Sequence, residues 1–386
     1  MQIFKKPNYK FMKYILIAFI FSGAVILTGI INITVGTGLN MGIDFAGGTL
    51  IQIQFKTPHP IGKLRQKLNQ AGLGESKIQE AGTGENEYII RSRLPEEKKN
   101  QKLEAHVLMG NKIVDILKTE EEKKSLKKGL KDLNNMSVND VASLLQPKYP
   151  DKAPSLAEKI VNLRNSSEFE GILQNYQQLN KAGISQDVIE FLQEKTFLGS
   201  MAIKRRETVG PQVGRDLRRK ATQATVWALI GMLIYIGLRF KFAYGVAAIL
   251  TLGHDVLITV GLFSLTPREV NLPVIAAILT IVGYSLNDTI VIFDRVRDNL
   301  KLLRKQDFKS ILDRSINQTL SRSFITSGTT FLTVTALFLF GGPVINDFAF
   351  TMMIGVLVGT YSSIYQSCPL LYFWNHIFKP KKGMRK

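Results

Sequence analysis

The sequence predicts a polytopic α-helical membrane protein with six transmembrane helices. Between the first two helices it predicts an α+β, ferredoxin-like extracytoplasmic domain that carries a helical insertion. Three observations support this fold class: six long apolar stretches, an uneven distribution of basic residues between the short loops, and the order of strand and helix patterns in the one long loop. The chain has 386 residues, 45% of them hydrophobic, and a formal net charge of +19.

Each of the six apolar stretches is close to the ~20 residues that a helix needs to cross a bilayer. They lie at 14–31, 221–238, 243–265, 272–293, 323–340 and about 348–373. The first stretch is longer than the ~7–15 residues of a signal-peptide core, so an uncleaved anchor is expected. We therefore expect the first transmembrane helix at 14–33 and helices two to six within 219–378.

The basic residues predict the orientation of the helices. The leader at 1–13 and the tail at 379–386 are basic, and bases are also dense in the loop from Arg295 to Arg314. The short loops on the other side hold a single base, Arg268. Because cytoplasmic loops carry the excess of Lys and Arg, both termini are expected in the cytoplasm and residues 34–218 outside.

The long loop has the pattern of a ferredoxin-like domain. Residues 49–55 alternate as a half-buried strand does, 61–72 form an apolar helical stripe, and 76–93 contain two short strands around a Gly-rich turn. A last strand at 200–210 completes the order β-α-β-β-α-β. The stretch at about 96–195 is rich in amphipathic helical patterns, and it is either a solvated elaboration or an arm that binds a partner.

Polar residues interrupt the apolar stretches at three places. Asp288 follows Asn287 in the fourth stretch, and Asp255 follows His254 in the third. The fifth begins with Arg322 and a helical face of hydroxyl groups, namely Thr326, Thr329, Thr330 and Thr333. Ionisable groups in membrane helices mark ion or substrate paths, so these residues predict a proton path in which the acid changes charge. The alternative is a buried ion pair that only fixes helix packing, and for His254 a hydrogen bond to a neighbour.

The composition argues against several other classes of function. Most clustered bases are either topology signals or mixed with Glu, so the net charge does not predict nucleic-acid binding. The sequence has no metal-ligand cluster, nucleophilic triad, P-loop or GxGxxG pattern. We therefore expect neither an enzyme nor a bound metal or cofactor. Cys368, the single cysteine, falls in the last apolar stretch and excludes an intrachain disulfide.

Four motifs together resemble the SecF branch of the SecD/SecF family. They are "MGIDFAGGTLIQIQF" after the first span, "VGPQVGRDL" before the second, "GHDV" in the third and "GYSLNDTIVIFDRVRDN" in the fourth. The resemblance implies a resistance-nodulation-division (RND) type half that pairs with SecD in the bacterial inner membrane. It also implies that the pair uses the proton motive force to pull unfolded exported polypeptides outward after SecA has driven them through SecYEG.

The resemblance also assigns residues. It makes Asp288 the membrane aspartate and Arg322 its arginine, and it places the "GIDFAGG" motif at the turn between the first span and the first strand. The motif positions are Gly42, Asp44, Phe45, Gly47 and Gly48. A structural role for this motif and a contact with the exported chain both remain open.

Two rival interpretations are left. One is half of an RND-type small-molecule or lipid exporter, although such pumps usually carry two halves and two large loops in one chain. The other is an assembly scaffold without a transport role, which would have no need of Asp288.

Overall fold

The chain divides into two compact units. The computed structural model describes residues 4, 7–74, 76–81, 86–92, 103–239 and 242–378. The membrane unit combines Met1–Gly42 with Leu217–Lys386, and the sheet unit is Ile43–Asp216. The basic tail predicted at 379–386 and most of the first six residues lie outside the described part of the chain.

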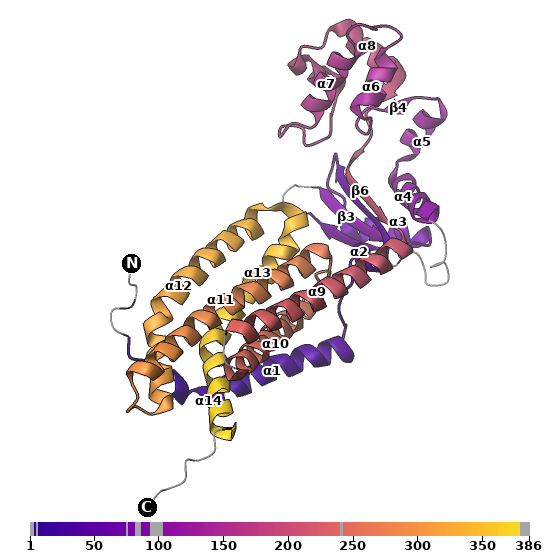
Figure 1. The fold of residues 1–386 in the computed structure, drawn as a ribbon. Coiled ribbons are helices and arrows are strands. Elements are labelled where there is room, and N and C mark those ends of the chain that lie inside the picture. Colours follow the sequence, from indigo (N-terminus) through magenta and orange to yellow (C-terminus); the bar gives the residue numbers. More distant parts are fainter. Residues whose placement is uncertain are drawn as a thin grey trace, which may run out of the picture. The chain divides into compact units, whose positions relative to one another are not determined.

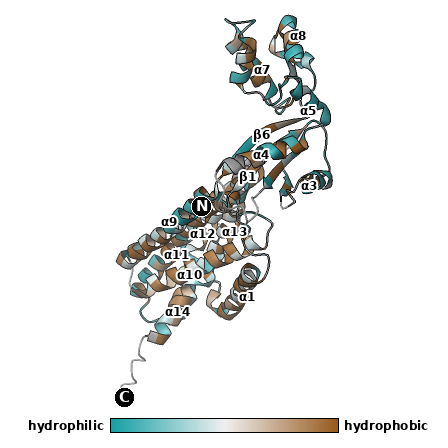
Figure 2. Ribbon diagram, turned by 90° about the vertical axis from the view of Figure 1, so that its right-hand side faces the viewer, coloured by the Kyte–Doolittle hydropathy of each residue, from teal (hydrophilic) through white to brown (hydrophobic). Residues whose placement is uncertain are grey.

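In the described residues of the membrane unit, six helical spans are long and apolar enough to cross a membrane. They are α1 (Ile15–Thr34), α9 (Pro211–Arg239), α10 (Phe242–Ser264), α11 (Leu272–Leu302), α12 (Phe308–Phe340) and a span at Ile345–Ile377. Helices α10, α11 and α13 pack against one another (Figure 1), and hydrophobic residues run along the whole unit (Figure 2). The prediction of six transmembrane helices is confirmed.

The sixth span consists of two helices rather than one. Helix α13 covers Gly342–Tyr365 and α14 covers Ser367–Phe378. A proline inside a helix clashes with the carbonyl four residues before it. Pro369 stands four residues after Tyr365, which explains why α13 ends there. Gln366, between the two helices, is buried and remains available for side-chain hydrogen bonds.

Glycines bring the central helices into close contact. A Cβ atom added to Gly29 of α1 would lie 2.5 Å from the Cα of Gly261 in α10. One added to Gly355 of α13 would lie 2.2 Å from the side chain of Ile281 in α11. Small residues at such crossings allow membrane helices to approach until short polar side chains can reach across.

The sheet unit contains the predicted ferredoxin-like fold. Strands β1 (Gly48–Phe55), β2 (Lys77–Glu80), β3 (Glu87–Ser92) and β6 (Met201–Val209) form an antiparallel sheet in the order β2-β3-β1-β6. Helix α3 (Ile61–Gln70) joins β1 to β2, and α4 (Leu103–Leu117) follows β3. The core of this layer is made of side chains from the sheet and both helices, namely Ile51, Ile53, Ile90, Leu64, Leu68 and Ile113. The residues of the predicted turn at 82–85 are not among those described.

The helical insertion is a lobe with its own hydrophobic core. It contains α5 (Glu120–Lys127), α6 (Val138–Leu145), α7 (Ala153–Arg164), a 3₁₀ helix (Tyr176–Ala182) and α8 (Gln186–Lys195). A parallel pair of two-residue strands, β4 (Lys131–Asp132) and β5 (Thr196–Phe197), joins its ends and was not predicted. The insertion predicted at about 96–195 therefore includes α4, which packs on the sheet as the second helix of the ferredoxin-like order.

Two of the quoted motifs pack against each other in the sheet unit. Residues Ile43–Ala46 form a short helix, α2, and Gly47 then turns the chain into β1 with a φ of 76°. A Cβ atom at Gly47 would lie 3.2 Å from the Cα of Pro211, and one at Gly214 would lie 3.2 Å from the carbonyl oxygen of Phe45. Glycine is needed at Gly47 both for the left-handed backbone and for this close approach. The tight turn expected of the motif is thus a helical turn followed by two glycines.

Glu122 links the lobe to the residue that precedes β6, Ser200. Its side chain accepts a hydrogen bond from the amide of Thr119 at 2.6 Å, as part of a capping box, and another from the amide of Ser200. Burial raises the pKa of the Glu122 carboxyl, but these two amides lower it by more, so that the pKa lies below its usual value. The folded state therefore favours the ionised carboxylate.

We predict that Glu122→Gln destabilises a fragment of residues 43–216 by about 1–3 kcal/mol at pH 7, since a buried amide loses a charged acceptor. A lowered folded pKa contributes stability above the unfolded pKa of about 4.3, and this contribution is lost as the pH falls through the folded pKa. The difference from wild type in thermal unfolding should therefore shrink below about pH 4.3. Glu121→Gln, an exposed neighbour, is the control, and an equal effect of both variants would contradict the assignment.

Candidate functional site

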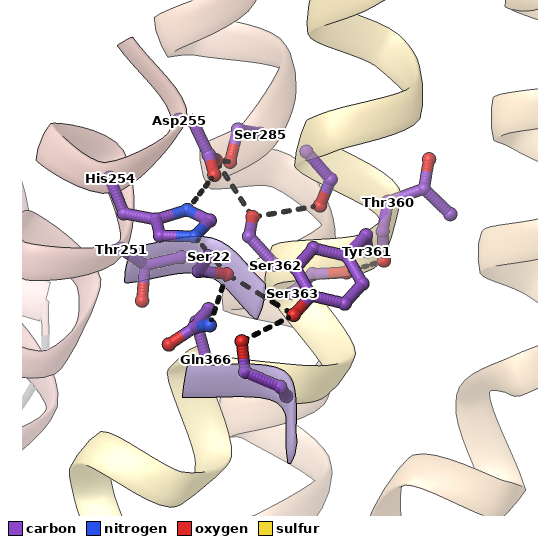
Figure 3. A network of polar contacts seen from close by, with 12 residues as sticks. Ser22, Thr251, His254, Asp255, Ser285, Thr360, Tyr361, Ser362, Ser363 and Gln366 are labelled. Atoms are coloured by element: carbon purple, nitrogen blue, oxygen red, sulfur yellow. Dashed lines mark hydrogen bonds and ion pairs between the residues drawn. The ribbon is translucent and has the colours of Figure 1, made fainter. Parts of the chain in front are cut away.

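A buried polar network joins four helices of the membrane unit (Figure 3). We call it the four-helix network; its members are Ser22, His254, Asp255, Ser285, Ser362 and Gln366. Asp255 of α10 has no exposed surface. Its carboxylate lies 2.9 Å from Nδ1 of His254 and 2.8 Å from the hydroxyl of Ser362 in α13, and it also accepts a hydrogen bond from Ser285 in α11.

The network continues from His254 to the first span. Nε2 of His254 lies 2.8 Å from the hydroxyl of Ser22 in α1, and the side-chain amide of Gln366 donates to the same hydroxyl at 2.9 Å. A neutral His254 satisfies all these partners when Gln366 donates to Ser22, Ser22 to Nε2, and Nδ1–H to Asp255. Three helices thus supply the hydrogen bonds that the buried carboxylate requires, and α1 supplies a fourth contact through His254.

A second carboxylate, Asp288, lies on α11 one turn after Ser285. It is 4% exposed, and Oδ2 lies 3.4 Å from the hydroxyl of Ser327 in α12. Thr360 of α13 donates to Ser327 at 2.7 Å. Helices α11 and α13 therefore contribute side chains around both carboxylates.

Two buried hydroxyl groups near Asp288 have no hydrogen-bond partner among the described residues, those of Ser323 on α12 and Thr289 on α11. Tyr284, four residues before Asp288 on α11, lies within reach of the hydroxyls of Ser327 and Thr330. Buried hydroxyl groups without protein partners commonly bond to ordered water. We call Tyr284, Asp288, Ser323, Ser327 and Thr360 the Asp288 group, and its composition suits a small chain of waters beside an acid.

The other predicted site residues lie around this group without bonding to the acid. Arg322 of α12 is exposed and forms no ion pair with Asp288, although it is near enough for its charge to act on the acid. Asn287 is exposed on α11. The hydroxyl of Thr326 donates to the carbonyl of Arg322 in its own helix at 3.0 Å.

Most of the motif residues predicted beside the first span belong to the sheet unit and not to the membrane unit. Asp44, Phe45, Gly47 and Gly48 are in the sheet unit. Gly42 ends the first segment of the membrane unit, where its amide donates to the carbonyl of Val270 at 2.8 Å. This bond ties the end of the first span to the loop between α10 and α11.

Sequence reasoning missed the small hydroxyl residues that surround the two acids. Ser285 had a usable signal, because a residue three positions before Asp288 falls on the same helical face. The cluster "TYSSIYQS" in the last span was another, since it puts Thr360, Ser362 and Gln366 into an apolar stretch. Ser22 and Ser327 had none beyond their presence in apolar helices.

We predict that Ser22→Ala weakens the membrane unit by about 1 kcal/mol, the usual size of a hydrogen bond between membrane helices. The change removes the hydroxyl that joins α1 to His254 and Gln366. Thr28→Val is the control, because the hydroxyl of Thr28 donates only to Ala24 of its own helix. Denaturant titration of the purified chain should separate the two variants, and equal stability would argue against a bracing role for the network.

The fold and these polar groups define a multi-pass membrane protein with a folded domain between its first two spans. Two family models match it: the C-terminal domain of the protein export membrane protein SecD/SecF at residues 188–376, and the SecD/SecF GG motif at residues 33–58. The chain belongs to the SecF family of protein translocase subunits, and the resemblance seen in the sequence is confirmed.

Individual relatives support this membership. The SecF subunit of Koribacter versatilis is 38% identical over 384 residues, which cover 96% of this chain and 93% of that subunit. The SecF subunit of Escherichia coli O157:H7 is 32% identical over 362 residues, which cover 94% of this chain and 86% of that subunit. The SecDF protein of Thermus thermophilus is 48% identical over 179 residues, covering 46% and 24%. These relatives are protein translocase subunits, so this chain is a membrane component of Sec protein export.

A solved structure of SecDF from Thermus thermophilus, described as a translocon-associated membrane protein, has the same fold. It superposes with a TM-score of 0.63 at 29% identity over 96% of this chain. The chain spans 39% of the length of that protein.

Proposed function

We propose that the chain, paired with SecD, uses the proton motive force to assist the late translocation of exported polypeptides through SecYEG, after SecA has driven their passage. The observation that carries the proposal is Asp288, a carboxyl group buried in a membrane helix. It is contacted by the hydroxyl of Ser327 in α12, which in turn accepts a hydrogen bond from Thr360 in α13. Charged groups within a bilayer are costly, so a carboxyl there is favoured when it can exchange a proton.

The geometry supports a cycle with two states of Asp288. With the acid protonated, the hydroxyl of Ser327 at 3.4 Å is a sufficient neighbour and Arg322 need not approach. When the proton leaves, the buried carboxylate requires a counter-charge or water. Arg322 is the proposed counter-charge, and its approach would move α12 relative to α11. Thr326 and Asn287 are proposed to hold water at the mouth of this path.

His254 and Asp255 are proposed as a second proton-holding pair. They share α11 and α13 with the Asp288 group through Ser285 and Ser362. A change of charge at one acid can therefore shift the helices that surround the other.

We predict that Asp288→Asn abolishes the part of export that depends on the proton motive force while the complex with SecD still assembles. Asparagine keeps the shape of the side chain but cannot release a proton. The measurement is the rate of export of a reporter in cells, with co-purification of SecD as the test of assembly. Arg322→Ala should lose the same part of the rate.

Asp298→Asn is the matched control, because Asp298 is an exposed carboxylate on the same helix. Wild-type export by Asp288→Asn would contradict the proton path, and failure of both Asp288→Asn and Arg322→Ala to assemble would favour a static ion pair. Asp255→Asn in the same assay tests the second pair, for which we expect a loss of rate with assembly intact.

We also propose that the chain lies in the bacterial inner membrane with both termini in the cytoplasm and residues 34–218 in the periplasm. The asymmetry of bases between the short loops supports this orientation. A periplasm-active enzyme fused after Gly84 should be active, and the same enzyme fused after Arg304 should be inactive. The opposite pattern of activity would refute the orientation.

A further inference from the structure

The described residues of the N-terminal leader, 4 and 7–13, are held along α12 by a regular series of hydrogen bonds. Three polar side chains spaced four residues apart on α12 form one stripe: Asp313, Asn317 and Ser321. They accept hydrogen bonds from the backbone amides of Met12, Tyr9 and Phe4 at 2.8, 2.9 and 3.2 Å, respectively. The side-chain amide of Asn317 also donates to the carbonyl of Tyr9 at 2.8 Å. The leader therefore runs antiparallel to α12 and forms a fixed wall beside it.

Between this wall, α12 and the end of α11 lies an open cleft of about 1260 Å³, which we call the basic cleft. Six of its lining side chains are basic, namely Lys10, Lys13, Arg295, Lys309, Arg314 and Arg322, against one acid, Asp313. The acid is already engaged by the amide of Met12. The cleft thus concentrates positive charge that its own acid does not balance.

Three of these six bases have no acidic partner within the described part of the chain. In the part of the chain that the structure describes, Lys10, Lys309 and Arg314 form no ion pair, and all three are exposed. Arg295 is directed by a hydrogen bond to Gln318, which also lines the cleft. Such a convergence of unpaired bases at one end of membrane helices is suited to a phosphate group.

Apolar side chains lie directly beside the bases. Ile325 and Phe4 line the cleft, and Phe4 makes an edge-to-face contact with Phe324 at 5.6 Å between ring centroids. Phe324 is 54% exposed, and Leu332, two turns further along α12, is 69% exposed. A soluble anion has no apolar part that could contact this surface, whereas the acyl chains of a lipid would lie along it.

We propose that the basic cleft binds the phosphate of an anionic phospholipid headgroup, with the acyl chains of the lipid lying along the exposed apolar side of α12. The proposal requires that the six helices span a membrane and does not depend on the proton path. Because Arg322 lines the inner part of the cleft and acts by charge on Asp288, a bound headgroup would also set the electrostatic surroundings of that arginine.

The test is a titration of short-chain phosphatidylglycerol into the detergent-purified full chain, with bound lipid counted by native mass spectrometry. Lys309→Gln with Arg314→Gln should weaken binding about 25-fold, since each base near an anionic surface contributes about a fivefold factor. The matched control is Lys301→Gln with Arg304→Gln, which removes the same charge from the end of α11 and the loop after it, outside the cleft. Lys309→Arg with Arg314→Lys keeps the charges and should keep most of the affinity.

Three results would overturn the proposal. Equal weakening in the control variant would mean that binding follows overall charge rather than the cleft. Equal binding of phosphatidylcholine with the same chains would mean that the headgroup is not recognised. An affinity for inorganic phosphate alone equal to that for phosphatidylglycerol would identify a soluble anion as the ligand. The proposal expects neither phosphatidylcholine nor phosphate to compete with phosphatidylglycerol.

Discussion

The membrane unit depends on the hydrogen bonding of two carboxyl groups that its helices bury. An ionised carboxylate in an apolar medium costs several kcal/mol unless it is paired or hydrogen-bonded. Asp255 meets this requirement with partners from three helices and, through His254, from a fourth. Asp288 meets it only in part, through a single long contact with Ser327. Asp255 therefore has more hydrogen bonds to stabilise its ionised form than Asp288 has. Protonation would lower the cost of burial more for Asp288 than for Asp255.

The packing of the helices serves the same requirement. Short hydroxyl side chains reach across only where backbones approach closely, and the glycines at Gly29, Gly261 and Gly355 allow that approach. The close crossing of α11 and α13 at Gly359 also places Ser285 near Ser362, so that both can reach Asp255. Polar network and helix packing are therefore one arrangement, and a substitution in either would disturb the other.

The sequence predicted the large features because each has a strong local signal. Apolar runs gave the six spans, the change of hydrophobic period gave the β-α-β-β-α-β order, and charges within apolar runs singled out His254, Asp255 and Asp288. The partners Ser22 and Ser327 could not be predicted, because Ser and Thr in helices often bond to their own backbone, as Thr326 does. Asn287 adjoins Asp288 in sequence, but one residue turns a helix by about 100°, so it points elsewhere. The division of the sixth span into α13 and α14 after Tyr365 has a signal in the sequence, which is Pro369.

Asp288 is proposed to gain and lose a proton within the membrane. Infrared difference spectroscopy of the complex with SecD, recorded across pH in a lipid bilayer, tests it directly, because a protonated carboxyl group has its own carbonyl band. We expect a band that appears and disappears with pH, is absent in Asp288→Asn and persists in Asp298→Asn. If no band is lost on Asp288→Asn, this carboxyl does not change its protonation state across the pH range, which would contradict a proton path through Asp288.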